Sequence, residues 1–197
     1  MSPRANLNRE RVLLTALELA DAHGYDHLTL AGVAAALGIR LPSLYNHVDG
    51  LPGLRRDIAL WGTRQLADEL RRAAVGRAGS DAIVHVARAY RTFAHQHPGA
   101  YTASLQHPSP EDVQLNAAAG EVFDVVAAVL RPYNLQGDDL IHAMRGLRSV
   151  MHGFVTLEHV GGFGMSVDRE ASFERLLAIY LHGLESSNTG NHLAKLP

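Results

Sequence analysis

The chain has 197 residues, of which 47% are hydrophobic and 19% are charged; this composition excludes wholesale disorder and allows a small domain fused to a larger one. It has no cysteine, which excludes disulfides, thiol catalysis and zinc sites built on thiolates. The net charge of −2 lacks the strong positive balance typical of nucleic-acid-binding domains, so such a function has to be argued from geometry.

The first ten residues are polar and basic rather than apolar, so we expect no secretory signal. The longest apolar stretches, such as residues 122–130, are interrupted by Asp124 and are too short to cross a bilayer. We therefore expect a soluble, cytoplasmic protein with no membrane partner.

The N-terminal part predicts three helices whose ends carry local signals. In the first, apolar residues 13, 16, 17 and 20 recur at helical spacing, Asn8 is a suitable N-cap, and Gly24 suits the left-handed position after the last turn. A second helix is expected from Thr29, whose hydroxyl can cap it, to residue 37. Gly38 permits a sharp turn, and a third short helix carries residues 43–48, with Pro42 in its first turn.

Longer helices are expected after Gly50. They cover residues 54–72, 80–97, 109–130, 138–160 and 168–185, with Ser80 and Ser109 as N-caps. Proline and glycine mark the breaks between them, and the polar tail from Ser186 is expected to fray. Alternating β-branched runs are absent. The chain is therefore predicted to be all-α, with about nine helices.

Residues 28–54 have the pattern that a helix-turn-helix needs. Ala34 is the small residue where the two helices cross, Gly38 lies in the turn, and apolar residues 33, 37, 39 and 44 can fix the angle of the second helix. This arrangement leaves Arg40, Leu41, Pro42, Ser43 and Asn46 free to face a major groove.

The run LTLAGVAAALGIRLPSLYNHVDGLPGL resembles the DNA-binding motif of the tetracycline-repressor-like (TetR) family, in which a cap threonine, a small residue and a glycine precede Leu-Tyr-x-His. The resemblance implies phosphate contacts from Thr29, Tyr45 and His47. It implies base contacts from Arg40, Leu41, Pro42 and Ser43. The alternative is a generic helical hairpin in which Tyr45 and His47 are merely half-buried.

Two places depart from that family's pattern. Leu51 stands where the family usually has a lysine that touches phosphate, and Ala31 and Gly32 stand where a polar or basic residue is common. Both departures remove phosphate contacts, so we expect weak non-specific affinity with a shallow dependence on salt.

The C-terminal part resembles a sensor domain of the same family that is named for a Trp-His-Gly sequence. The resemblance rests on HPGAYTASL and RGLRSVMHGFVTLE, in which Met151-His152-Gly153 takes that place without the tryptophan. We expect a largely apolar effector pocket there. Its predicted lining is Trp61, Phe93, Tyr101, Met151 and Phe154, with His152 or Arg148 as the polar anchor. Core packing is the alternative role for the aromatic residues, and a solvated face or an intersubunit ion pair is the alternative for the arginine.

Other chemistry finds little support in the sequence. Twelve histidines suggest metal binding, but His95 and His97 cannot share a ligand on a helix and no His-x-x-x-His pair lies on a predicted helix. We therefore predict no metal site, with metal sensing as the alternative. No nucleophile motif, phosphate-binding glycine loop or pair of helical acids is present, so we predict no catalytic residue and no cofactor.

Together these patterns predict a helix-turn-helix DNA-binding domain over residues 1–55 and a ligand-binding and dimerisation domain over residues 56–197. The expected function is transcriptional regulation, by family habit repression, with operator DNA, a small-molecule effector and a second copy of the chain as partners. The last two helices are the expected dimer interface, because the apolar stripe of residues 173, 176, 177, 180, 181 and 184 is too wide to leave in water. The alternative is a helical metal-binding or interaction protein, or a small helical enzyme, that does not bind DNA.

Overall fold

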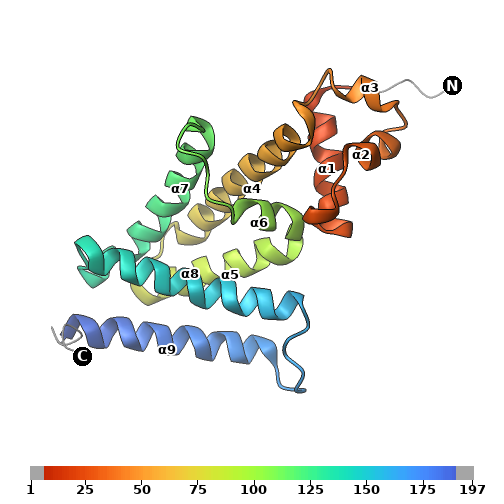
Figure 1. Cartoon of the computed structure of the whole chain (residues 1–197). Helices are drawn as coiled ribbons and strands as arrows, with labels where there is room; N and C mark the ends of the chain where they lie inside the picture. Colours follow the sequence, from red (N-terminus) through yellow and green to blue (C-terminus); the bar gives the residue numbers. More distant parts are fainter. Residues whose placement is uncertain (1–6, 190–197) are drawn as a thin grey trace, which may run out of the picture. The chain divides into compact units, whose positions relative to one another are not determined.

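The computed structural model describes residues 7–189, with side chains described as far as residue 186. This part of the chain contains nine α-helices, two 3-10 turns and no strand (Figure 1). The α-helices are α1 (Arg9–His23), α2 (Leu30–Ala36), α3 (Leu41–Leu44), α4 (Gly50–Ala74), α5 (Gly79–Gln96), α6 (Pro98–Ser104), α7 (Val113–Leu130), α8 (Gly137–His159) and α9 (Arg169–Thr189). The 3-10 turns cover Tyr25–His27 and Arg131–Tyr133. The all-α prediction is confirmed.

Helix ends that depend on neighbouring residues lie where the sequence predicts them. The Asn8 side chain accepts a hydrogen bond from the Arg11 backbone N–H at 2.8 Å and so caps α1. Gly24 ends that helix at a φ of 92°, a conformation that side chains other than glycine rarely adopt.

Three helices begin elsewhere than predicted, one of them α4, which starts at Gly50 rather than at residue 54. Helix α3 covers only Leu41–Leu44, ahead of the predicted residues 43–48, because the chain passes into a turn that His47 closes on the Leu44 carbonyl. Helix α7 begins at Val113 rather than at Ser109, and its cap is Asp112, whose carboxylate accepts from the Leu115 N–H at 3.1 Å. The segment from Ser109 to Asp112 forms a turn instead.

The prediction that the apolar stretches are too short to cross a bilayer is wrong for one helical segment. The continuous helical segment Val113–Tyr133 is long and apolar enough, by length and composition alone, to cross a bilayer. The sequence did not reveal this segment as a single apolar run, because Glu121 and Asp124 interrupt it. Glu121 and Asp124 lie within this segment with exposed side chains, and Glu121 forms an ion pair with Arg71.

The described chain divides into two compact units. The head unit comprises the residues up to Leu66 together with Gln96–Gly120, and the bundle unit comprises Ala67–His95 and the residues from Glu121 onward. This division differs from the predicted domain boundary at residues 55 and 56, since α4 continues unbroken through that point and α6 packs with the N-terminal helices. The division by function, 1–55 and 56–197, stays a prediction.

The head unit is held together by close backbone packing and by an ion pair between an exposed arginine and a buried carboxylate. Helix α6 lies so near α1 that an ideal Cβ at Gly99 would stand 2.5 Å from the backbone carbonyl carbon of Ala20. The Gly99 N–H also donates to the Asp21 carboxylate at 2.8 Å. At the other end of α1, Arg9 donates twice to the buried carboxylate of Asp57 on α4, at 2.9 and 3.0 Å.

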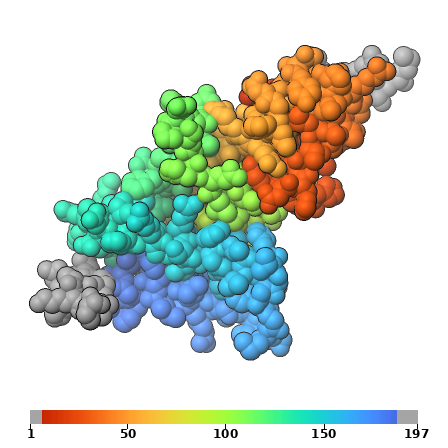
Figure 2. Space-filling model, viewed as in Figure 1, coloured from red at the N-terminus to blue at the C-terminus, as the bar shows by residue number. Residues whose placement is uncertain are grey.

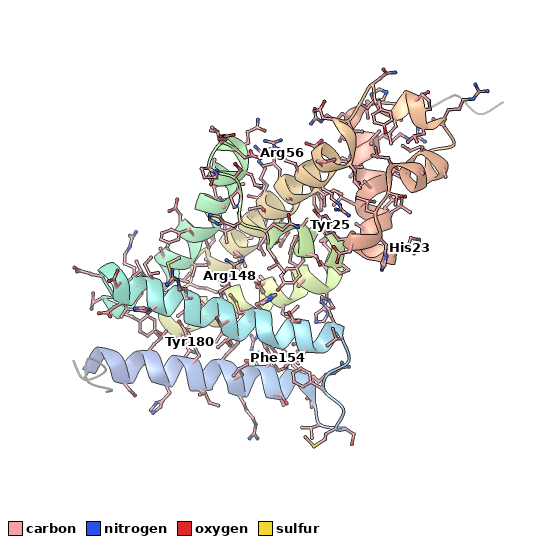
Figure 3. All side chains as sticks on the ribbon, in the orientation of Figure 1. His23, Tyr25, Arg56, Arg148, Phe154 and Tyr180 are labelled. Atoms are coloured by element: carbon pink, nitrogen blue, oxygen red, sulfur yellow. The ribbon has the colours of Figure 1, made fainter. Side chains whose placement is uncertain are left out.

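In the bundle unit, α8 and α9 run side by side (Figure 1). Of the predicted stripe on α9, Phe173, Leu177 and Leu184 are buried within the chain itself and the other three residues are half-buried. Tyr180 donates its hydroxyl to the Ala143 carbonyl at 2.7 Å and ties the two helices together (Figure 3). Much of the stripe therefore serves the fold of one chain, and this weakens its use as an argument for a dimer.

Candidate nucleic-acid interface

The turn between α2 and α3 is built from local hydrogen bonds around Gly38. The Ile39 N–H donates to the Ala34 carbonyl and the Gly38 N–H to the Ala35 carbonyl, each at 3.0 Å, which is the Schellman pattern of helix ends. Gly38 adopts a φ of 67°, so a side chain there would strain the turn. The Ala35 side chain is exposed, whereas Ala34 is buried where the helices cross.

Apolar side chains fix the position of α3 on α2. Val33 and Leu44 are fully buried, and Leu37 and Ile39 are half-buried. A buried leucine or valine contributes about 1.5–3 kcal/mol relative to an exposed one, so these few residues set the angle of a helix too short to form by itself. Of the four apolar supports predicted from the sequence, two are therefore fully buried and two are half-buried.

The predicted phosphate contacts lie around this motif. Thr29 caps α2 by accepting from the Gly32 N–H at 3.1 Å, and its hydroxyl hydrogen is left to donate outward. Tyr45 is 57% exposed, an unusual exposure for a large aromatic residue, while His47 is half-buried. An exposed phenol and an exposed hydroxyl are donors that a phosphate could accept from.

The predicted base contacts all lie at the start of α3. Arg40 occupies the N-cap position in an extended conformation and its side chain is exposed. Leu41, Pro42 and Ser43 follow it in the first turn, and all three are exposed. The structure therefore brings the four residues together at one end of one helix, which is where a recognition helix carries its readout residues.

The predicted effector residues divide between the two units. Trp61 and Tyr101 belong to the head unit, where the Trp61 ring lies edge-on to His97 with ring centres 5.4 Å apart. Phe93, Arg148, Met151, His152 and Phe154 belong to the bundle unit. None of the seven is among the residues that line two cavities of the head unit.

Within the bundle unit, the predicted anchors and aromatics have different surroundings. Phe93, Met151 and Phe154 are buried, Arg148 is exposed and His152 is half-buried. Burial, with a smaller effect of the Arg148 charge, lowers the pKa of His152, so its ring is held neutral and can donate and accept. A neutral imidazole at the edge of an apolar region suits a hydrogen bond to an uncharged ligand.

Phe154 takes part in a cluster that the sequence did not reveal. Its ring centre lies 4.8 Å from that of Phe163 and 5.0 Å from that of Phe173 (Figure 3). The Arg91 guanidinium lies over the Phe154 and Phe173 rings and pairs with Glu158 and Glu170. These contacts give Phe154 a role in the core of the unit.

Comparison with known proteins identifies the family. A family model described as the C-terminal domain of tetracyclin-repressor-like proteins matches residues 83–180. Rv0681 of Mycobacterium tuberculosis, named as a helix-turn-helix-type transcriptional regulator, is 38% identical over 186 residues, which cover 94% of this chain and 85% of that protein. The chain belongs to the TetR family.

A second curated relative and a solved structure are also similar to this chain, the structure in its fold. The helix-turn-helix-type transcriptional regulator YobS of Bacillus subtilis is 32% identical over 189 residues, which cover 95% of this chain and 98% of that protein. A TetR variant of Acinetobacter baumannii, solved in complex with minocycline, shares the fold with a TM-score of 0.67 at 18% identity and covers 94% of this chain and 100% of its own.

This TetR-family chain is a DNA-binding transcriptional regulator and not an enzyme, as its relatives indicate. The alternatives of a helical enzyme and of a helical protein that does not bind DNA are therefore set aside. Proteins of the family bind operator DNA, form dimers and bind small molecules.

Proposed function

We propose that the protein is a homodimeric, cytoplasmic repressor that a small-molecule effector releases from operator DNA. The observation that carries this proposal is the exposed cluster of Arg40, Leu41, Pro42 and Ser43 at the start of a helix held on buried supports. The proposed roles are base readout for these four residues and phosphate contact for Thr29, Tyr45 and His47. Repression, rather than activation, follows the habit of the family.

The two classes of contact make different predictions. Phosphate contacts position the protein on DNA, so the loss of one weakens binding to all DNA sequences alike. Base contacts decide which sequence is preferred. An arginine on guanine is worth about 1–3 kcal/mol of discrimination, which corresponds to a factor of roughly 5–150 in affinity. Arg40 is exposed at the start of α3, where a side chain can reach a base. We therefore expect Arg40→Ala to relax the base preference at one position of the operator.

Binding-site selection with purified protein tests these roles. DNA flanking the protein's own gene serves as the first target, with affinity measured by fluorescence anisotropy. Tyr45→Phe should weaken specific and random duplexes by similar factors, and Arg40→Ala should alter the selected sequence. Arg64→Ala, an exposed arginine on α4, is the matched control and should change neither. An unchanged selected sequence for Arg40→Ala would remove that residue from the readout.

We propose a dimer through α8 and α9 because one helix-turn-helix buries too little DNA surface for specific binding. Both helices keep exposed apolar residues after folding: Leu157 is 46% exposed and Ile179 is 70% exposed. Ile179→Glu is a sharper probe than a change at Leu177, which is fully buried and would disrupt the core. Sedimentation at micromolar concentration should show dimers for the parent chain and for Thr92→Glu, an exposed change on α5, but monomers for Ile179→Glu.

We propose that the effector binds in the bundle unit, against Phe93, Met151 and Phe154, with His152 or Arg148 as the polar anchor. A role of Trp61 and Tyr101 of the head unit in effector binding stays a prediction. A ligand releases the operator if it binds the DNA-free conformation more tightly than the DNA-bound one. The free energy of DNA binding that is lost equals the difference between the ligand's binding free energies for the two conformations. We expect the effector to be largely apolar, since the three buried residues offer only carbon and sulfur atoms.

His152 offers the cleanest test of this site. Phe154→Ala would leave a cavity beside Phe163 and Phe173, at a cost of about 3–5 kcal/mol, so a changed response would have two explanations. His152→Ala leaves these rings in place. A library screened by thermal shift and then by operator release should yield effectors that act less strongly on His152→Ala and unchanged on His142→Ala, an exposed control on the same helix. An equal response of both variants would exclude His152 as the anchor.

A further inference from the structure

The head unit contains a cavity of about 380 Å³ between the beginning of α4 and the loop that joins α6 to α7. Its size lies in the range of small-molecule sites. The lining residues are Tyr25, Leu51, Pro52, Arg55, Arg56, Ala59, Gln106, His107, Pro108, Ser109 and Leu115. In Figure 2 the loop is the green surface beside the orange start of α4. None of these residues has a role in the proposed DNA or effector contacts.

The charges around this cavity favour an anion. Two arginines line it, and no carboxylate is among the lining residues. Arg56, labelled in Figure 3, is already satisfied, because its Nε and Nη2 donate to the two Asp112 carboxylate oxygens at 2.5 and 2.7 Å. This pair connects α4 to the cap of α7 and closes one side of the cavity.

Arg55 has a hydrogen-bond donor that no group among the described residues accepts from. Its guanidinium lies over the Tyr25 ring at 5.3 Å, and its Nη2 makes one long hydrogen bond, 3.3 Å, to the Asp26 carbonyl oxygen. Its Nε is buried and has no hydrogen-bond partner among the described residues. Buried donors without a partner are rare in folded proteins, and an acceptor such as a water molecule, an ion or a ligand is one explanation for such a donor. A guanidinium donates from two neighbouring nitrogens in the geometry that a carboxylate accepts.

The rest of the lining suits an apolar body. Leu51, Ala59 and Leu115 contribute aliphatic surface, and the Tyr25 ring lies beside Arg55. Gln106, His107 and Ser109 are exposed, so they stand where the cavity opens to solvent. We propose that this cavity binds a small organic carboxylate, with its carboxylate on Arg55 and its apolar body against Tyr25, Leu51 and Leu115.

Such a ligand would touch both sides of the joint between α4 and the α6–α7 loop. Helix α4 begins at Gly50, five residues after Tyr45 of the DNA-binding motif, so a molecule seated on Leu51 and Arg55 bears directly on the start of that helix. The site differs from the proposed effector site because all of its residues belong to the head unit. Binding to it does not depend on the proposed repressor function and is measured without DNA.

Calorimetry with a matched pair of probes tests this site on the full chain. The probes are 2-naphthoate and the uncharged 2-naphthalenemethanol. We expect the carboxylate to bind at least tenfold more tightly than the alcohol. Arg55→Gln should weaken naphthoate at least tenfold, and Arg64→Gln, an exposed change on the same helix, should leave it unchanged. Gln106→Trp places a large ring at the exposed mouth and should also block the carboxylate.

Three results would overturn the proposal. One is the absence of saturable naphthoate binding, and another is equal binding of the two probes. The third is a loss of binding on His152→Ala with no change on Arg55→Gln and Gln106→Trp, which would place the probe in the bundle unit. Because Gln106 is exposed, its variant keeps the test decisive even if Arg55→Gln unfolds the chain.

Discussion

Adding one methyl group at Gly99 tests the contact between α1 and α6. An ideal Cβ at this position would lie 2.5 Å from the Ala20 carbonyl carbon, 2.6 Å from the Ala20 Cβ and 2.8 Å from the Ala20 oxygen. Carbon atoms that are not bonded approach to about 3.5–4.0 Å, so Gly99→Ala forces the two helices apart by about 1 Å. The neighbouring atoms are mostly backbone, which cannot rotate away as a long side chain would.

This separation has a calculable cost. Overpacking of a close contact destabilises by about 1–3 kcal/mol, and the gain of alanine over glycine in a helix offsets about 0.5–1 kcal/mol of it. The net loss then spans about 0–2.5 kcal/mol, and its midpoint of about 1.2 kcal/mol corresponds to a melting temperature lower by about 2–5 °C for a chain of this length. The hydrogen bond from the Gly99 N–H to Asp21, now 2.8 Å, should also lengthen.

Urea unfolding followed by circular dichroism measures the change, with all variants at one protomer concentration because dimerisation adds to stability. Gly120→Ala is the control: its Cβ would meet no atom within 4 Å, so it should stabilise by about 0.5–1 kcal/mol. If Gly99→Ala unfolds at the same urea concentration as Gly120→Ala or a higher one, the two helices are not in the tight contact described.

Three further changes probe individual contacts. Glu158→Gln leaves Arg91 without its buried partner and should cost about 3 kcal/mol at neutral pH. Hydrogen bonds from Arg91 lower the pKa of Glu158. The ion pair therefore stabilises the folded chain fully above the ordinary carboxyl pKa of 4.5, and this stabilisation is lost as pH falls through the lowered pKa. The melting curves of the variant and the parent should converge only below pH 4.5. Tyr180→Phe removes the bond to the Ala143 carbonyl and should cost about 1 kcal/mol in urea unfolding. Asp112→Asn breaks the pair with Arg56 and should lower the melting temperature more than Glu111→Gln, an exposed change one residue earlier.

The features that the sequence predicted well depend on residues a few positions apart. Asn8 and Thr29 cap the helices that follow them, and Gly24 and Gly38 end the helices before them. Each of these signals acts through a hydrogen bond or a backbone angle within one turn, so no knowledge of the rest of the chain is needed. The helix-turn-helix was predicted for this reason.

The features that escaped prediction depend on partners far along the chain. Ser109 followed by Pro110 has the form of a helix start, yet α7 begins at Val113 and is capped by Asp112, whose carboxylate pairs with Arg56, 56 residues away. The pairs Arg9–Asp57 and Arg91–Glu158 span 48 and 67 residues. Nothing in the local pattern of an arginine tells which carboxylate it meets. The effector residues were hardest for the same reason, because core and pocket aromatics have the same spacing on a helix.

The long-range pairs also bear on the charge of the head unit, which has seven arginines against eight carboxylates and so no positive excess. Helix α4 has Leu51 where the resemblance of the motif led us to expect a lysine for phosphate, and its next cations, Arg55 and Arg56, lie against Tyr25 and Asp112. Arg9 is likewise committed to Asp57. Because these side chains are engaged within the head unit, we expect the phosphate contacts to come from the hydroxyls of Thr29 and Tyr45 and from His47. Hydroxyl donors carry no charge and release few counterions on binding, so we expect the DNA affinity of this head to come mainly from the shape of α3 and from Arg40 and to fall only slowly as salt rises.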